Sequence, residues 1–236
     1  MFNTPRILLR RDMLAWRRLL EGFARLFPDG VNLHNIGTFP IVRDLGLQIH
    51  VDASIPIVNH LTLKELKTLG ARRGVLSPEL TLDEAAILAA RAPFPVECIV
   101  EGNLELMVSK YCPLGSFLEN AASSCSMPCR KKNKRYALLD RKGMFFPLVF
   151  DASCHMHVLN SKRLSMLLHA MKFAPRGITF LRIDGRFMEA AALGRCVSLY
   201  KEWSDFSGTL LKEQEEYLKK LEGADTTRGH YFRGVQ

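Results

Sequence analysis

Short apolar runs alternate along the chain with segments of helical periodicity. The runs are rich in β-branched residues, and in the intervening segments apolar residues recur every three or four positions. This alternation is typical of βα units and predicts a parallel sheet covered by helices, an α/β fold. The predicted strands are 31–35, 48–52, 73–77, 95–100 and 178–183.

Capping motifs and apolar stripes indicate where helices begin and end. Thr62–Glu65 and Thr81–Glu84 both match the capping box, in which a hydroxyl and a glutamate satisfy backbone N–H groups of the first turn. Apolar stripes predict one helix before the first strand, ended by Pro28–Gly30, and another near the C-terminus. The stripes are Trp16, Leu19, Leu20, Phe23, Leu26 and Phe27, and Leu210, Leu211, Tyr217, Leu218 and Leu221.

One segment departs from this alternation. Tyr136–Asp140 and Phe145–Phe150 flank the turn sequence Arg141-Lys-Gly143, which predicts an inserted β-hairpin. We expect residues 1–30 to form an N-terminal helical segment and residues 31–236 to form one α/β domain.

Composition narrows the class of protein. With 236 residues, 47% hydrophobic and 24% charged, the chain can bury a core, and disorder is excluded. The net charge of +9 attracts polyanions, although an ordinary basic surface has the same balance. No apolar run has the length of a signal peptide or of a membrane span, so we expect a cytoplasmic protein with no membrane association.

Polar residues stand at the ends of the predicted strands. In parallel α/β folds these ends carry the functional site, since strands hold side chains rigidly while loops vary. Some of the polar residues would instead only cap helices. The candidate catalytic carboxylates are Asp52, Glu79, Glu101 and Asp184, with Glu97 a further member of a paired acid–base site. The candidate substrate-binding residues are His34, Asn35, Asn59, Arg182 and Arg186.

The two arginines of that set have two interpretations. Arg182 and Arg186 could clamp a carboxylate or phosphate, or form an ion pair with Asp184 at the strand end.

The cysteine spacing carries the sharpest chemical signal. In a reducing compartment the six cysteines are free, catalytic or metal-bound. Structural zinc sites usually offer two close cysteine pairs, and here only Cys125 and Cys129 form one. The spacing leaves an iron–sulfur cluster, a zinc site and unliganded thiols open. Cys98 and Cys196 lie on an apolar strand and in a helical stretch, as core thiols do. The candidate metal ligands are Cys112, Cys125, Cys129 and Cys154.

Several motifs, in order, resemble the core of the peptidase U32 family. They are Glu97–Gly115, Cys125–Lys131, Leu139–Leu148 and Asn160–Lys162, with Ile49–Asn59 and Val75–Leu80 upstream and Leu181–Arg186 and Thr227–Val235 downstream. Together they cover about residues 31–235. Their joint order is more specific than any single motif.

The resemblance implies a TIM-barrel-like fold and a [4Fe-4S] cluster held by Cys112, Cys125 and Cys129. We assign Cys154 as the fourth ligand, whereas in some members an N-terminal cysteine completes the set. The family is named after collagenase-type proteases. Its better-understood members resemble oxygen-independent hydroxylases of transfer RNA, ribosomal RNA or ubiquinone precursors, some with prephenate as oxygen donor. A third alternative is a non-catalytic, cluster-bearing subunit or truncated remnant.

Two departures from the family pattern matter for the fold and the site. The Leu-Ala-Pro-Ala-Gly-type motif that opens the family domain is missing, and Glu101-Gly102 replaces a common His-Gly pair. We therefore expect the C-terminal portion of the domain, a partial barrel that lacks the N-terminal strands. Its open sheet edge would need a protein partner or an oligomer to cover it.

RNA is the other expected partner. The basic run Arg130–Arg135 and the terminal Arg228 and Arg233 offer phosphate contacts. Tyr136, Tyr231 and Phe232 lie close enough in sequence to stack on bases. A solvated loop and aromatic side chains packed against the barrel are the alternatives.

Overall fold

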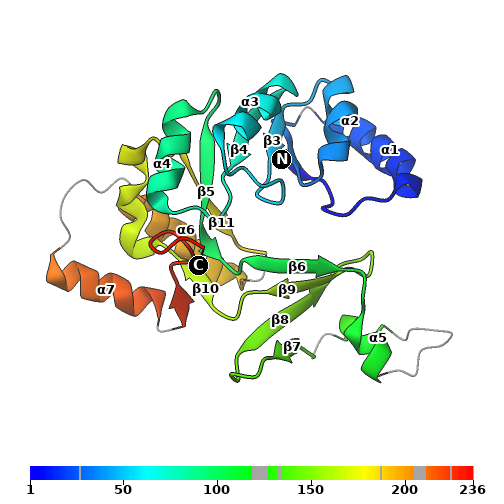
Figure 1. Ribbon diagram of the computed structural model, residues 1–236. Coiled ribbons are helices and arrows are strands. Elements are labelled where there is room, and N and C mark those ends of the chain that lie inside the picture. The colour runs from blue at the N-terminus through cyan, green and yellow to red at the C-terminus, as the bar shows by residue number, and fades with distance from the viewer. Residues whose placement is uncertain are drawn as a thin grey trace.

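A mostly parallel sheet forms the centre of the molecule in the computed structural model (Figure 1). The structure describes residues 1–26, 28–118, 127–131, 134–186, 188–204, 211–223 and 225–235. The strand order is β1-β2-β3-β4-β5-β10-β12, and β11 also pairs with β5. The strands are β1 Phe2–Asn3, β2 Val31–Leu33, β3 Ile49–Val51, β4 Ala71–Val75, β5 Val96–Gly102, β10 Arg163–Ser165, β11 Phe180–Asp184 and β12 Thr226–Thr227.

Strand direction explains the position of the site. β1 to β5 and β11 run parallel to their neighbours, so their C-terminal ends share one edge of the sheet. β10 is antiparallel to β5. All seven residues of β5 are buried, as expected of a central parallel strand covered on both faces.

Helices cover this sheet and contribute to one apolar core. Buried residues of the helices, such as Leu20, Leu63, Leu88 and Tyr200, belong to the same cluster as those of the strands. The helices are α1 Met13–Ala24, α2 Phe39–Asp44, α3 His60–Thr68, α4 Leu82–Arg91, α5 Pro113–Leu118, α6 Ala190–Ser204 and α7 Lys212–Glu222. No helix among the described residues is long and apolar enough to cross a bilayer.

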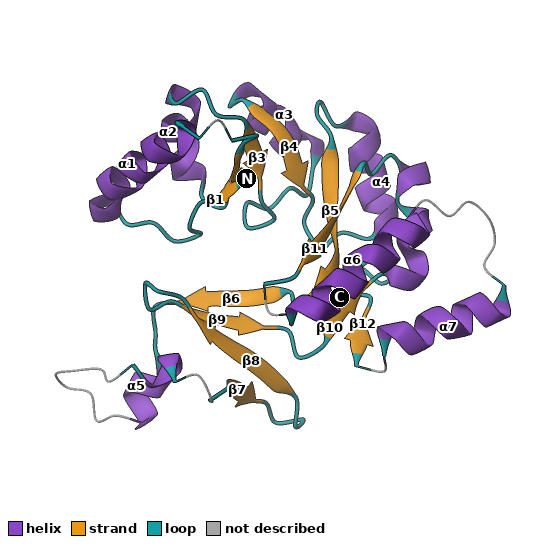
Figure 2. Cartoon of the chain, turned by 180° about the vertical axis from the view of Figure 1, so that it is seen from behind, coloured by secondary structure: helices purple, strands orange, loops and turns teal. Residues whose placement is uncertain are grey.

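A second, antiparallel sheet lies beside the main sheet (Figure 2). Its order is β6-β9-β8-β7, and it is inserted between β5 and β10. Its own small core consists of Leu148, Met156 and Val158. The strands are β6 Glu105–Ser109, β7 Tyr136–Leu139, β8 Phe145–Phe150 and β9 Met156–Leu159.

The main sequence predictions are confirmed. Each of the five predicted strands overlaps an observed one, and the hairpin is β7 and β8, which pair antiparallel. Gly143 has a φ of +78° in the connecting turn, a conformation that glycine adopts without strain. The predicted first and last helices correspond to α1 and α7, although Leu26 and Leu211 lie just outside these helices. Phe27 and Leu210 lie outside the described residues.

One capping prediction is wrong. Thr81 forms the expected capping box with Glu84, but α3 begins at His60, before Thr62. Asn59 is its cap, since its side chain accepts a hydrogen bond from the Thr62 backbone N–H at 2.9 Å. Asn59 therefore caps this helix in place of the Thr62 hydroxyl that we expected to do so.

The N-terminal segment is part of the main sheet, and the described strands do not close into a barrel. Residues 1–30, which we set apart, contribute β1 to the main sheet and Leu20 to its core. Among the described strands the sheet does not close, because β1 and β12 end the order without pairing to each other. The coarser α/β prediction with a mostly parallel sheet is confirmed; which family strands are missing stays a prediction.

The capping difference gives a direct stability test. Thr81→Ala removes the hydroxyl that accepts from the Glu84 N–H, so we expect a loss of about 1 kcal/mol in the free energy of unfolding. Thr62→Ala is the control and should change it by less than about 0.5 kcal/mol. Urea denaturation measures both, and equal losses would contradict the assignment of the caps.

Candidate functional site

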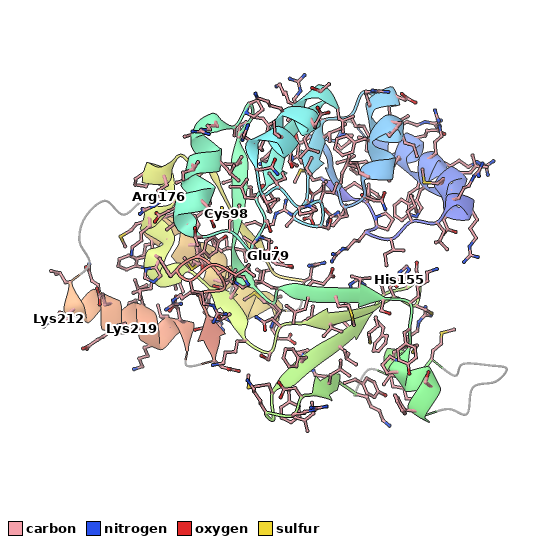
Figure 3. The ribbon with its side chains drawn as sticks, viewed as in Figure 1. Glu79, Cys98, His155, Arg176, Lys212 and Lys219 are labelled. Atoms are coloured by element: carbon pink, nitrogen blue, oxygen red, sulfur yellow. The ribbon has the colours of Figure 1, made fainter. Side chains whose placement is uncertain are left out.

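A cleft of about 1140 Å³ separates the C-terminal edge of the parallel strands from the small sheet. Its walls are rich in titratable side chains, and Figure 3 shows Glu79 beside the main sheet and His155 near the small one. The titratable lining residues are Arg6, His34, Asp52, Arg73, Glu79, Glu97, Glu105, Asp151, His155, His157, Arg182, Asp184 and Arg186.

Arg182 on β11 holds two carboxylates at the floor of the cleft. Its Nη1 donates to Asp52 Oδ2 at 2.6 Å, and its Nε donates to Glu97 Oε1. Asp52 directly follows β3, Glu97 is the second residue of β5 and Arg182 is the middle residue of β11, and all three side chains are mostly buried. Two carboxylates this close would repel each other without the guanidinium between them.

Arg73 on β4 extends this ionic cluster. Its Nε lies 3.4 Å from Glu97 Oε2, and its Nη2 donates to His50 Nδ1 at 2.8 Å. Burial, reinforced by the charge of Arg73, lowers the pKa of His50 to about 4, so His50 is neutral and can accept this bond. The Arg73 guanidinium also lies 4.5 Å from the centre of the Phe180 ring.

His34 and Asp52 form a potential acid–base pair. His34 Nδ1 lies 3.2 Å from the Asn32 carbonyl, which can only accept, so Nδ1 carries the proton of the neutral ring. Burial lowers the pKa of His34, although Asp52 opposes the shift. Nε2 therefore keeps a lone pair 3.4 Å from Asp52 Oδ1, and a proton taken up there would be stabilised by this carboxylate.

Asp52 itself stays ionised. Burial raises its pKa, but His34, the Ser54 backbone N–H and Arg182 outweigh burial, so the net shift is downward. Asp52 therefore offers a fixed negative charge between a histidine and an arginine. Such a charge orients a histidine and stabilises its protonated form.

The opposite wall carries a second chain of titratable groups. His157 Nδ1 lies 2.6 Å from Glu105 Oε2, and its Nε2 lies 3.6 Å from Asp151 Oδ2. The hydrogen bond to Glu105 raises the pKa of His157. Arg6 also binds Glu105, which joins the N-terminal loop to β6 across the cleft. His155 bonds Asp151 Oδ2 at 2.8 Å, and its buried Nε2 has no hydrogen-bond partner among the described residues.

Two further predicted residues line the cleft as an ion pair. Arg186 binds Asp184 through Nε at 2.8 Å and Nη2 at 2.6 Å. This is the alternative in which Arg186 pairs with its own strand end. The Arg186 side chain is still 53% exposed, the most of the four arginines in the cleft.

Three predicted residues are not brought to the cleft. Glu101 is 2% exposed and binds Arg163 and the Tyr200 hydroxyl in a buried network. Its position inside β5, rather than after it, turns it toward β10. Asn35 and Asn59 accept hydrogen bonds from backbone N–H groups at the starts of the helical segments that follow them.

The described cysteines of the predicted metal site lie at one end of the small sheet. Ser109, the last residue of β6, pairs with Met156; Cys112 follows the former closely and Cys154 precedes the latter. Cys129 lies in the 3-10 helix Pro128–Arg130, which packs against α5, the helix that begins just after Cys112.

These thiols are not a complete ligand set. Cys125 lies outside the described residues. Among the residues that are described, no three His, Cys, Asp or Glu side chains are grouped so as to hold a metal ion. Cys112 Sγ accepts a hydrogen bond from the Gly115 N–H at 3.4 Å.

The other two cysteines lie in the core, as their sequence context indicated. Burial raises the pKa of Cys98 to about 12 and that of Cys196 to about 11. Both thiols therefore stay protonated, and a protonated thiol is a poor metal ligand.

Sequence reasoning missed the roles of Glu105, His157 and Arg6. Glu105 and His157 are 52 residues apart and meet only because β6 pairs with β9. Their sequence signal is weak, because each is a charged or polar residue in a short apolar run. The structure places both on the cleft-facing side of a strand.

Comparison with known proteins gives a consistent result. The model of peptidase family U32 matches residues 4–236. A Methanocaldococcus jannaschii protein named as an uncharacterized protease is 25% identical over 245 residues, which cover 98% of this chain and 58% of that protein. No solved structure matches.

Other similar proteins carry a different name. The tRNA hydroxylation protein P of Helicobacter pylori J99 is 23% identical over 224 residues, covering 91% of this chain and 53% of that protein. The Escherichia coli K12 protein of the same name is 21% identical over 249 residues, covering 87% and 55%. The chain thus spans about half the length of the curated relatives it matches.

The floor of the cleft is expected to be critical for stability. Arg182→Met leaves Asp52 and Glu97 without their shared cation, so we expect a loss of about 3 kcal/mol in the free energy of unfolding. Arg176→Met is the control, because Arg176 lies 3.7 Å from the exposed Asp83 and should lose less than about 1 kcal/mol. Similar losses in both variants, measured by chemical denaturation, would refute the role of Arg182.

We expect the pKa of His157, on the opposite wall of the cleft, to lie above its ordinary value. We expect the NMR titration midpoint of His157 to lie above 6.5 and to fall toward 6.5 in Glu105→Gln, while His50 and His169 stay near 4. Because the pKa is raised on folding, the stabilisation is complete below pH 6.5 and is lost as the pH rises through the raised value. A His157 midpoint at or below 6.5 in the unaltered protein would contradict this.

Proposed function

Because the chain belongs to peptidase family U32, as its motifs predicted, we propose that it is the core of an oxygen-independent hydroxylase. The enzyme would hold a [4Fe-4S] cluster and modify an RNA base or a quinone precursor. Relatives named as tRNA hydroxylation proteins align over 87% and 91% of the chain and support this choice. One observation carries the proposal: three separate segments bring cysteines to the end of the small sheet that walls the cleft.

The donor set suits an iron–sulfur cluster. Cys112 is half-buried and its sulfur already accepts a backbone N–H, as cluster thiolates commonly do. Cys129 and Cys154 are the other described ligands of the proposal, and Cys125 completes it. Arg130 and Lys131 follow Cys129 directly, and their positive charge would raise the reduction potential of a bound cluster. When bound, such a cluster supplies one-electron chemistry.

The residues of the chain supply proton transfer and binding. Neutral His34 is suited to accept a proton at Nε2, with Asp52 stabilising the charged ring. His157, with its raised pKa, is suited to donate one from the opposite wall. An acid and a base held on facing walls are the pair that general acid–base catalysis requires.

Prephenate is the oxygen donor that the family resemblance implies. It carries two carboxylates, and arginine guanidinium groups bind carboxylates well. Arg186 is the most exposed arginine of the cleft and already forks onto a carboxylate, that of Asp184. A substrate carboxylate would replace Asp184 there with the least rearrangement. The other three cleft arginines also bind carboxylates of the protein, and they are less exposed.

Peptide hydrolysis is the second candidate. The name of the archaeal relative and the His34–Asp52 pair favour it. A serine protease, however, needs a hydroxyl that donates to the base. Ser54, the serine closest in sequence to this pair, donates instead to the His34 carbonyl at 3.0 Å.

Metal analysis tests the proposed function. We expect the anaerobically purified protein to contain about four iron and four sulfide per chain, and Cys125→Ala to lose most of both. Cys98→Ala is the matched control; it removes a thiol of the core, and its iron content should be unchanged. Equal iron in the wild type and Cys125→Ala would remove the cluster from the account.

The same variants distinguish the hydroxylase, the protease and the non-catalytic subunit. Gelatin cleavage that persists in Cys125→Ala would favour the protease. Iron and sulfide without hydroxylation of any RNA or quinone precursor would favour a non-catalytic, cluster-bearing subunit.

A further inference from the structure

The cleft-facing side of the small sheet continues beyond the cleft as an exposed apolar track. Side chains at alternate positions of a strand share one face, so Phe145, Pro147 and Val149 of β8 point the same way. Val149 lines the cleft and lies opposite His157, whereas Phe145, at the far end of the strand, is 64% exposed. Leu139, the β7 partner of Phe145, is 62% exposed. The track thus leads from the hairpin into the cleft.

The inserted segment that carries this track is rich in positive charge, and Arg141 and Lys142 lie at the outer end of the track. Residues 103–160 contain eight lysines and arginines against four aspartates and glutamates. The described cations are exposed, and none of them makes an ion pair with a described carboxylate: Lys110, Arg130, Lys131, Lys134, Arg135, Arg141 and Lys142.

The carboxylates of the segment are already engaged where they are described. Glu105 and Asp151 bind Arg6 and the two histidines of the cleft wall. Asp140 Oδ1 accepts the backbone N–H groups of Lys142 and Met144, both at 2.8 Å. Because basic residues outnumber acidic residues two to one in this segment, its acidic groups do not cancel its positive field.

Arg141 and Lys142 form the tip of the β7–β8 hairpin, and their side chains make none of the hydrogen bonds that close the turn. The turn is closed by the Asp140 N–H to the Met144 carbonyl at 3.0 Å and by the Gly143 N–H to the Asp140 carbonyl at 3.1 Å. These two bonds involve neither Arg141 nor Lys142. Of the bonds to Asp140 Oδ1, one uses the backbone N–H of Lys142, and none uses a basic side chain. The side chains can be exchanged without loss of the turn.

We propose that this surface, the hairpin tip with Phe145 and Leu139, binds an unpaired stretch of RNA and guides it into the cleft. Arg141 and Lys142 contact phosphates, and a base stacks on the Phe145 ring. Basic residues beside an exposed aromatic ring are the elements of single-strand binding, in which stacking tolerates any base. The choice of RNA rests on the proposed function; the position and chemistry of the surface do not.

An acidic peptide fits this surface less well. It would satisfy the cations but would leave Phe145 and Leu139 exposed to water. A nucleotide offers a charge and a flat ring together, and thus matches both parts of the surface. An acidic peptide is therefore an outcome of the test rather than a second proposal.

Charge reversal at the hairpin tip tests the phosphate contacts. The probe is a fluorescein-labelled, unstructured RNA of mixed sequence, and anisotropy is measured at about 100 mM salt, where the screening length is about 10 Å. We expect Arg141→Glu/Lys142→Glu to raise Kd at least about tenfold and to reduce the slope of log K against log salt by about 1.4. The matched control is Lys212→Glu/Lys219→Glu, on the distant α7 (Figure 3). It has the same net charge and should stay within about twofold of the wild type.

Substitution of Phe145 tests stacking separately. Phe145→Ala should raise Kd by about fivefold or more, and Phe145→Tyr should restore binding, because only the ring face is needed. Phe145 lies outside the small core of Leu148, Met156 and Val158, so neither change should unfold the sheet. Single-stranded DNA of the same sequence should bind comparably, since it offers the same phosphates and bases.

Several results would overturn the inference. These are equal weakening by the hairpin and α7 reversals, wild-type affinity in the hairpin variant, tighter binding of duplex than of single strands, and an acidic peptide that displaces the RNA with equal affinity in Phe145→Ala.

The RNA-binding experiment and the metal analysis can each give a negative result without the other, so failure of this inference is distinguishable from failure of the proposed function. Iron present with RNA binding insensitive to the hairpin would leave the hydroxylase and remove this surface. RNA binding that depends on the hairpin, in a protein that contains no iron, would leave this surface and remove the hydroxylase.

Discussion

The ion cluster of Arg182 with Asp52 and Glu97 is the interaction on which the rest of the site depends. It joins three strands, β3, β5 and β11, that are far apart in the sequence. The guanidinium between these two mostly buried carboxylates offsets their mutual repulsion. With Asp52 fixed in this way, His34 has a negative charge beside its Nε2, and the floor of the cleft keeps its shape.

The two walls of the cleft shift the pKa values of His34 and His157 in opposite directions. Burial dominates at His34 and lowers its pKa, whereas the hydrogen bond to Glu105 dominates at His157 and raises its pKa. The different environments of the two histidines thus suit them to the base and acid roles proposed above. In the small sheet, the described thiols lie near one end of β8 and the basic hairpin is at the other.

Much of the fold was predictable because its signals are local. Alternation of apolar runs and helical stripes located the five strands, and turn residues located the hairpin. The strands β1, β10 and β12, of two or three residues each, lie outside the predicted runs and are defined by their pairing with other strands. In the site, the strand-end rule found Asp52 and Arg182. It erred at Glu101, because β5 continues to Gly102 and buries that carboxylate against Arg163. The pair Glu105–His157 depends on a long-range strand pairing that no local pattern contains.

X-ray absorption at the iron edge, on the full chain prepared without oxygen, tests the central claim that thiols of the small sheet hold a cluster at the cleft. The account predicts a first shell of sulfur around iron and a second shell of iron, both lost in Cys112→Ala. A first shell of oxygen or nitrogen, or iron that remains unchanged in that variant, would contradict it.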